Sequence, residues 1–293
     1  MSDGMTALDS AWIAANPVPV HGQGTTKNSR GRVLAIGGSC KVPGALRLTG
    51  EAALRVGAGK LQMATVASAA ISLGLLVPEA ASIALPEDDD GEVGDAAAAL
   101  TNALEACDAL VLGPGVGDPA VAARLLQLVL NQRRDDLSLV IDAMAVGCLR
   151  NMQENVASFR GRLIITPNHS EMAVLTGGHE DQIDADPRQI ACDTARKFGA
   201  VVVLKGSDTV IAGPDGDTLH YGGGGTGMAT GGSGDVLAGA IGGLLSRGMP
   251  PFVAAGWGVW LHGQSGRRLA TTSGPIGFLA RELPAELPRL LPQ

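Results

Sequence analysis

The segment GGGGTGMATGGSGDVLAGAIGGLL, residues 222–245, joins a glycine-rich turn to an apolar run of helical length. Gly231, Gly232 and Gly234 permit a tight turn in which successive backbone N–H groups point outward. Such a turn at the positive end of a helix dipole binds anions. Asp235 is the only charged residue of the segment, and its position suits helix capping and proton transfer equally well. A carboxylate beside an anion site favours phosphate chemistry.

Short apolar runs alternate with alanine-rich helical runs upstream of this segment. Fully apolar strands separated by helices indicate a mostly parallel sheet with helices on both faces, which is an α/β fold. Strands are predicted at 32–36, 60–66, 81–85, 108–113, 137–142, 162–167 and 200–206.

The late part of the sheet has a different pattern. The runs 208–213 and 217–222 flank a Pro-Asp-Gly turn and predict an antiparallel edge. Helices are expected at 233–247 and 251–270. Because no Pro/Ser-rich linker divides the chain, we expect residues 1–293 to form a single domain.

The composition excludes several classes of function. The net charge of −7 and an aromatic content of 3% argue against a nucleic-acid partner. The N-terminal stretch lacks a basic segment before an apolar one, and no apolar run approaches about 18 residues, so we expect neither a signal peptide nor a membrane partner. The scattered cysteines predict free thiols and a cytoplasmic location; they are Cys40, Cys107, Cys148 and Cys192.

Several predicted strands end in glycine or polar residues. The ends read IGGS, LGPGVGD, IDAM, ITPNHSE and LKGSDT. Any one of them is explained by an ordinary turn. Ligands of open α/β sheets bind beyond the carboxyl ends of the strands, so five such ends together predict a binding crevice there.

The chain resembles the NAD(P)H-hydrate dehydratases of the ribokinase-like superfamily. GTGMATGGSGDVLAG, residues 225–239, is similar to their signature. The blocks at 33–65, 110–117, 140–146, 165–177 and 202–211 follow in the order of the family. The resemblance implies a ribokinase-like fold and the dehydration of (6S)-NADHX or NADPHX to NADH or NADPH.

The resemblance also implies cofactors and partners. A nucleotide, ADP or ATP, would activate the hydroxyl of the hydrated nicotinamide ring, and Mg²⁺ would accompany it. Stand-alone bacterial members use ADP and release AMP and phosphate. A homo-oligomer, as a homotetramer, and a separate epimerase acting on the same metabolite are expected.

Site residues follow from the same resemblance, position by position. Asp235 would be the base that removes the hydroxyl proton. Substrate contacts would come from Ala45, Gly117, Asn168 and Asp235. Nucleotide contacts would come from Lys205, Gly206, Ser207, Asp208, Thr209, Gly232, Ser233 and Gly234.

Some positions depart from the family pattern and keep other functions open. Asn168 replaces a histidine, Met144 an acid and Val42 a tyrosine. Asn168 and Glu171 form Asn-x-x-Glu, which resembles the magnesium-linked motif of ribokinase-type kinases and makes Glu171 a candidate metal ligand. A small-molecule kinase is therefore the alternative function, and a non-catalytic nucleotide-binding protein is a third.

Overall fold

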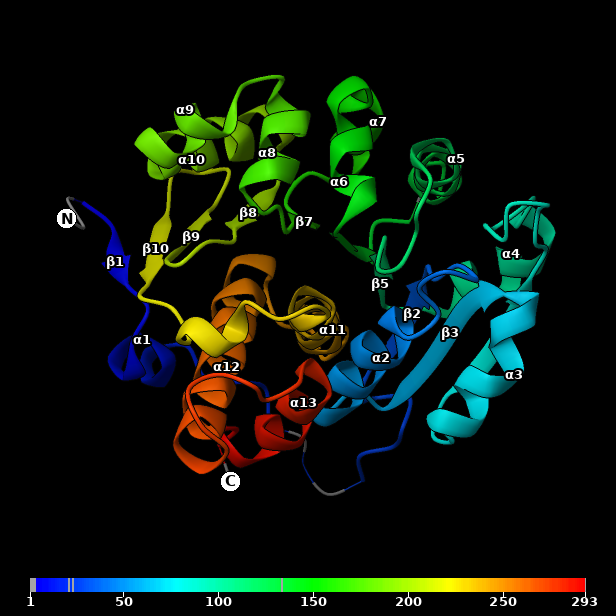
Figure 1. Cartoon of the computed structure of the whole chain (residues 1–293), viewed down its shortest axis with the longest axis horizontal. Coiled ribbons are helices and arrows are strands. Elements are labelled where there is room, and N and C mark those ends of the chain that lie inside the picture. The colour runs from blue at the N-terminus through cyan, green and yellow to red at the C-terminus, as the bar shows by residue number, and fades with distance from the viewer. Residues whose placement is uncertain (1–3, 21, 23, 133, 293) are drawn as a thin grey trace.

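The apolar runs form one sheet in the computed structural model, which describes residues 4–20, 22, 24–132 and 134–292 (Figure 1). The strand order is β1-β10-β9-β8-β7-β6-β5-β2-β3-β4. Every strand expected from the sequence is confirmed. The strands are β1 (Thr6–Ala7), β2 (Arg32–Ile36), β3 (Lys60–Val66), β4 (Ala81–Leu85), β5 (Ala109–Leu112), β6 (Ser138–Ile141), β7 (Leu163–Ile165), β8 (Val201–Leu204), β9 (Thr209–Ala212) and β10 (Thr218–Tyr221).

Strand direction also agrees with the sequence pattern. The pairs from β4 through β3, β2, β5, β6, β7 to β8 are parallel. β9 runs antiparallel to both β8 and β10, which confirms the late antiparallel part. The two-residue β1 pairs in parallel with β10 beyond it, and the sequence offered no sign of so short a strand.

Helices cover both faces of the sheet, because successive strand residues point to opposite sides. The helices are α1 (Ser10–Ala15), α2 (Ala45–Arg55), α3 (Ala67–Leu76), α4 (Ala97–Ala106), α5 (Pro119–Leu130), α6 (Met144–Cys148), α7 (Gln153–Val156), α8 (His169–Thr176), α9 (Glu180–Ala185), α10 (Pro187–Phe198), α11 (Ser233–Ser246), α12 (Pro251–Thr272) and α13 (Leu283–Glu286). In β2, Leu34 and Ile36 pack into one apolar core with α4, α5, α8 and α10, whereas Val33 and Ala35 pack into the other with α2, α11 and α12.

Two sequence-based exclusions can be compared with the structure. None of the helices in the described ranges is both long enough and apolar enough to cross a membrane. The four cysteines are free thiols, as expected from their scattered positions.

α11 lies between α2, α12 and the sheet, and its glycines allow the close approach (Figure 1). A Cβ atom at Gly239 would lie 2.0 Å from the backbone oxygen of Thr49 in α2. One at Gly242 would lie 2.4 Å from Val111 in β5, and one at Gly243 2.5 Å from Val56. The glycines of the opening segment therefore serve two purposes, a turn at the N-terminus of α11 and tight packing along the helix.

We expect Gly239→Ala to lower the free energy of unfolding by about 1–3 kcal/mol, because the new methyl group overpacks the contact with α2. The better helix propensity of Ala, about 1 kcal/mol, offsets only part of this cost. Gly44→Ala is the control, since a Cβ there meets nothing within 4 Å and φ is −77°. Equal denaturant midpoints for the two variants would contradict the packing described above.

Candidate active site

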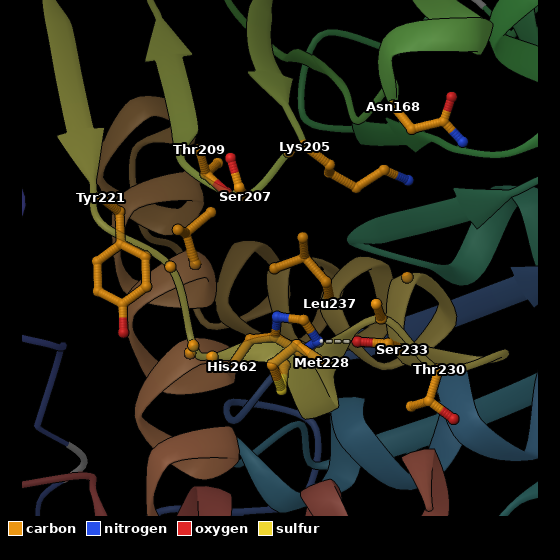
Figure 2. A pocket seen from close by; sticks show the side chains of 18 of the residues that line it. Asn168, Lys205, Ser207, Thr209, Tyr221, Met228, Thr230, Ser233, Leu237 and His262 are labelled. Carbon is orange, nitrogen blue, oxygen red and sulfur yellow. Dashed lines mark hydrogen bonds between the residues drawn. The ribbon is translucent and has the colours of Figure 1, made fainter. Parts of the chain in front are cut away.

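Three of the five polar strand ends, IDAM, ITPNHSE and LKGSDT, line a cavity of about 960 Å³ at the carboxyl ends of β6 and β8, beside the N-terminus of α11. The ends IGGS and LGPGVGD are not in its lining. Figure 2 shows Lys205 reaching into it from the end of β8, with Ser233 and Leu237 of α11 facing it from below. Of the residues expected to form the site, the cavity brings together Asn168, Glu171, Lys205, Gly206, Ser207, Thr209, Gly232, Ser233, Gly234 and Asp235.

Three expected site residues lie outside the cavity lining. The side chain of Asp208 is largely exposed and lies 3.6 Å from His220 Nε2. Ala45 begins α2 and is buried, and the N–H of Gly117 donates to Glu92 Oε2 at 3.2 Å. One helical turn after Ala45, Leu48 Cδ1 lies 2.4 Å from where a Cβ at Gly232 would be, so the N-terminus of α2 borders the glycine turn.

The glycine turn leaves backbone donors available at the start of α11. Gly232 has φ +90°, a left-handed conformation, and it supplies no capping side chain. The Ser233 N–H donates to the Thr230 carbonyl at 3.2 Å. Within the described chain the N–H groups of Gly234 and Asp235 have no partner, and both residues line the cavity. This arrangement can receive a phosphate group.

Lys205 is paired with two carboxylates, Asp142 directly after β6 and Glu171 in the first turn of α8. Its Nζ donates to Asp142 Oδ1 at 2.7 Å and lies 3.7 Å from Glu171 Oε2. Asp142 is buried and also accepts a hydrogen bond from Thr166 Oγ1 at 2.6 Å. Burial opposes the charged form of Lys205, but the two carboxylates outweigh it and raise the pKa of the ammonium. The lysine therefore stays protonated beside the anion site.

Asp142 was not among the site residues expected from the sequence. The sequence feature that could have identified Asp142 as a site residue is its position in IDAM, directly after β6. Lys205 approaches it from two strands away, because β7 lies between β6 and β8. Only the strand order could show that the two side chains meet.

Asp235 lies in the first turn of α11, where no side chain makes a capping hydrogen bond. No hydrogen bond in the described structure involves its carboxylate. Burial raises its pKa to about 7, and the nearby Asp142 adds to this shift, while Lys205 opposes it. A carboxylate that titrates near neutral pH can accept a proton and release it again at that pH.

The Asn-x-x-Glu motif forms a capping box at the start of α8. Asn168 Oδ1 accepts from the Glu171 N–H, and Glu171 Oε2 accepts from the Asn168 N–H, both at 2.8 Å. Burial raises the pKa of Glu171, against the effect of Lys205. No group of three or more Asp, Glu, His or Cys side chains in the described ranges could hold a metal ion. The motif therefore has a structural role, which is to cap the start of α8.

His262 of α12 is a further cavity residue that the sequence did not single out. Its Nε2 lies 2.9 Å from Ser233 Oγ (Figure 2). Burial lowers its pKa to about 4, so the imidazole is neutral at pH 7. A histidine inside a long helix carries no local mark of such a contact, which arises only from the packing of α12 against α11.

Comparison with known proteins agrees with this geometry. The profile of the NAD(P)H-hydrate dehydratase family matches residues 33–289. A protein of Xanthomonas campestris pv. campestris named ADP-dependent (S)-NAD(P)H-hydrate dehydratase is 43% identical over 285 residues, 97% of this chain and 95% of the relative. A protein of the same name from Neisseria meningitidis is 35% identical, covering 88% and 83% of the two chains.

Bifunctional relatives and solved structures complete the comparison. The chain spans about half of the Moorella thermoacetica "Bifunctional NAD(P)H-hydrate repair enzyme Nnr", with 37% identity over 97% of this chain and 53% of the relative. The ADP/ATP-dependent NAD(P)H-hydrate dehydratase of Bacillus subtilis, co-crystallised with ATP/Mg²⁺, superposes with a TM-score of 0.81 at 27% identity, covering 98% and 97% of the chains. A ribokinase-like superfamily protein of Enterococcus faecalis reaches 0.84 at 29% identity, covering 98% and 95%. The fold is thus ribokinase-like, and the chain belongs to the NAD(P)H-hydrate dehydratase family.

Proposed function

We propose that the chain dehydrates (6S)-NADHX and NADPHX to NADH and NADPH, using ADP and releasing AMP and phosphate. The observation that carries the proposal is the placement of Asp235, a carboxylate with a pKa of about 7, beside the unpaired N–H groups that begin α11. The names of the relatives from Xanthomonas and Neisseria support the choice of substrate and of ADP.

In this proposal Asp235 removes the proton from the ring hydroxyl as the oxygen bonds to the terminal phosphorus of ADP. The bond from that phosphorus to the bridging oxygen breaks, and AMP leaves. The ring C–O bond then breaks and phosphate departs with its electron pair, the neighbouring ring carbon loses a proton to solvent, and the electrons of that C–H bond restore the ring double bond. The N–H groups of Gly234 and Asp235, with Lys205, stabilise the charge on the phosphoryl group.

Magnesium would neutralise charge on the nucleotide phosphates. We infer that the nucleotide phosphates would provide most of the ligands, with Glu171, which lines the cavity, as the candidate from the protein. None of the steps assigned to the protein side chains depends on the metal. The co-crystallisation of the Bacillus relative with ATP/Mg²⁺ supports a nucleotide-borne ion.

The cellular setting follows from the same family. We infer a cytoplasmic enzyme, since its four thiols are free and its substrate derives from a soluble cofactor. The name of the bifunctional repair enzymes supports our inference that an epimerase acts on the same metabolite.

We expect turnover with (6S)-NADHX, Mg²⁺ and ADP, followed by the return of dihydronicotinamide absorbance and by released phosphate. Asp235→Asn should lower kcat about 100-fold or more, because it removes the base. Its dissociation constant for ADP should stay near that of the wild type. A stable phosphate ester in place of free phosphate would indicate the kinase alternative, and wild-type turnover by the variant would reject Asp235 as the base.

We expect kcat to rise with pH and level off above an apparent pKa of about 7, because protonated Asp235 cannot accept the hydroxyl proton. Asp142→Asn removes a neighbouring negative charge, so the rise should move to lower pH. Asp215→Asn, in an exposed turn, is the control and should leave the profile unchanged. A profile that is unaffected by Asp142→Asn would contradict the charge coupling.

We further propose that the chain self-associates through α3 and the edge strand β4. Ile71 and Leu75 of α3 are each 79% exposed, and neither element contains a charged residue. A two-fold interface places identical residues against one another, which an uncharged apolar face allows. The unpaired edge of β4 also carries no lysine or proline to prevent strand pairing.

Leu75→Glu should shift the wild-type oligomer toward smaller species, because it places like charges on both sides of the interface. Light scattering after size exclusion measures the mass. Val174→Glu is the matched control, since Val174 is an exposed apolar residue on α8. A monomeric wild type, or equal effects of the two variants, would contradict this surface.

A further inference from the structure

α12 lies directly behind the glycine-rich segment that lines the cavity. A Cβ at Gly263 would lie 2.3 Å from the Tyr221 ring, and one at Gly266 would lie 2.2 Å from Met228 Sδ. Tyr221 and Met228 both line the cavity. The segment therefore packs against the face of α12 that carries Gly263 and Gly266, which have no side chains.

Polar groups of α12 hold this segment near each end. Near its start, the Arg267 guanidinium donates to the carbonyl oxygens of Gly222 at 3.2 Å and Gly223 at 3.0 Å. At its other end, His262 Nε2 lies 2.9 Å from Ser233 Oγ (Figure 2). Ser233 is the first residue of α11, immediately before the unpaired N–H groups of Gly234 and Asp235.

The Ser233–His262 contact has no role in the chemistry proposed above. Ser233 is buried, and the neutral imidazole adds no charge to the floor of the anion site. Gly232, with φ +90° and no capping side chain, does little to restrain the first turn of α11. A hydrogen bond to the adjacent residue supplies the missing restraint.

We propose that His262 is a positioning residue for nucleotide binding, which holds Ser233 and so orients the first turn of α11 toward the phosphate. This inference rests on the proposed function, because it takes the cavity to be the nucleotide site. A turn that is already ordered loses less conformational entropy when the ligand binds, so more of the interaction free energy contributes to affinity. The imidazole acts through Ser233, not by contact with the nucleotide.

The test is a double-mutant cycle with ADP binding measured by isothermal titration calorimetry, which needs no turnover. His262→Phe keeps a ring of similar size and removes the hydrogen bond. It should weaken ADP binding about 5- to 10-fold. His262→Gln should restore most of the affinity, because its amide nitrogen can occupy the place of Nε2. In a Ser233→Ala background, His262→Phe should cause a further loss of less than about twofold.

Two results would overturn the proposal. One is unchanged ADP affinity in His262→Phe, and the other is an equal loss in the presence and absence of the Ser233 hydroxyl, which would mean that the ring contacts the nucleotide itself. If His262→Phe does not fold, His262→Asn replaces it, since its shorter side chain does not reach Ser233. Thr271→Ala, on the exposed side of α12, is the control and should bind ADP as the wild type does.

The same titrations separate this proposal from the proposed function. A wild-type chain that does not bind ADP would reject the nucleotide site, and the role of His262 with it. A wild-type chain that binds ADP but shows no coupling between His262 and Ser233 would reject only the role of His262.

Discussion

The close approach of α11 to α2 and β5 determines where the candidate site can form. Gly239, Gly242 and Gly243 remove the side chains that would keep the helix away from its neighbours. The N-terminus of α11 is thereby held beside the carboxyl ends of β6 and β8. The helix dipole, the unpaired N–H groups and Asp235 all arrive at the cavity because of this packing.

The charged side chains in the cavity differ in their partners. Lys205 is paired with Asp142 and Glu171, so it remains charged although it is largely buried. Asp235 makes no hydrogen bond and retains a pKa of about 7. One buried carboxylate thus stabilises a cation, while another stays available for proton transfer. This division between two acids is a common way to assign different chemical roles to identical groups.

Much of the fold was predictable because its signals are local. Most of the longer strands are largely apolar runs, and several of them end in glycine or polar residues, whereas β1 escaped notice because two residues carry no pattern. The Asn168–Glu171 spacing was ambiguous for a physical reason, since residues three apart at a helix start suit a capping box as well as a metal motif. Asp142 and His262 were missed because their partners lie far away in the sequence.

The sequence by itself determined the strands other than β1, the helices α11 and α12, the glycine turn and the family, because these depend on neighbouring residues and on the order of motifs. The tertiary structure alone decided which side chains meet. Lys205, Asp142 and Asp235 come from separate segments, and the strand order and the packing of α11 bring them into one cavity. Their protonation depends on burial and on mutual charge, which exist only after the chain has folded.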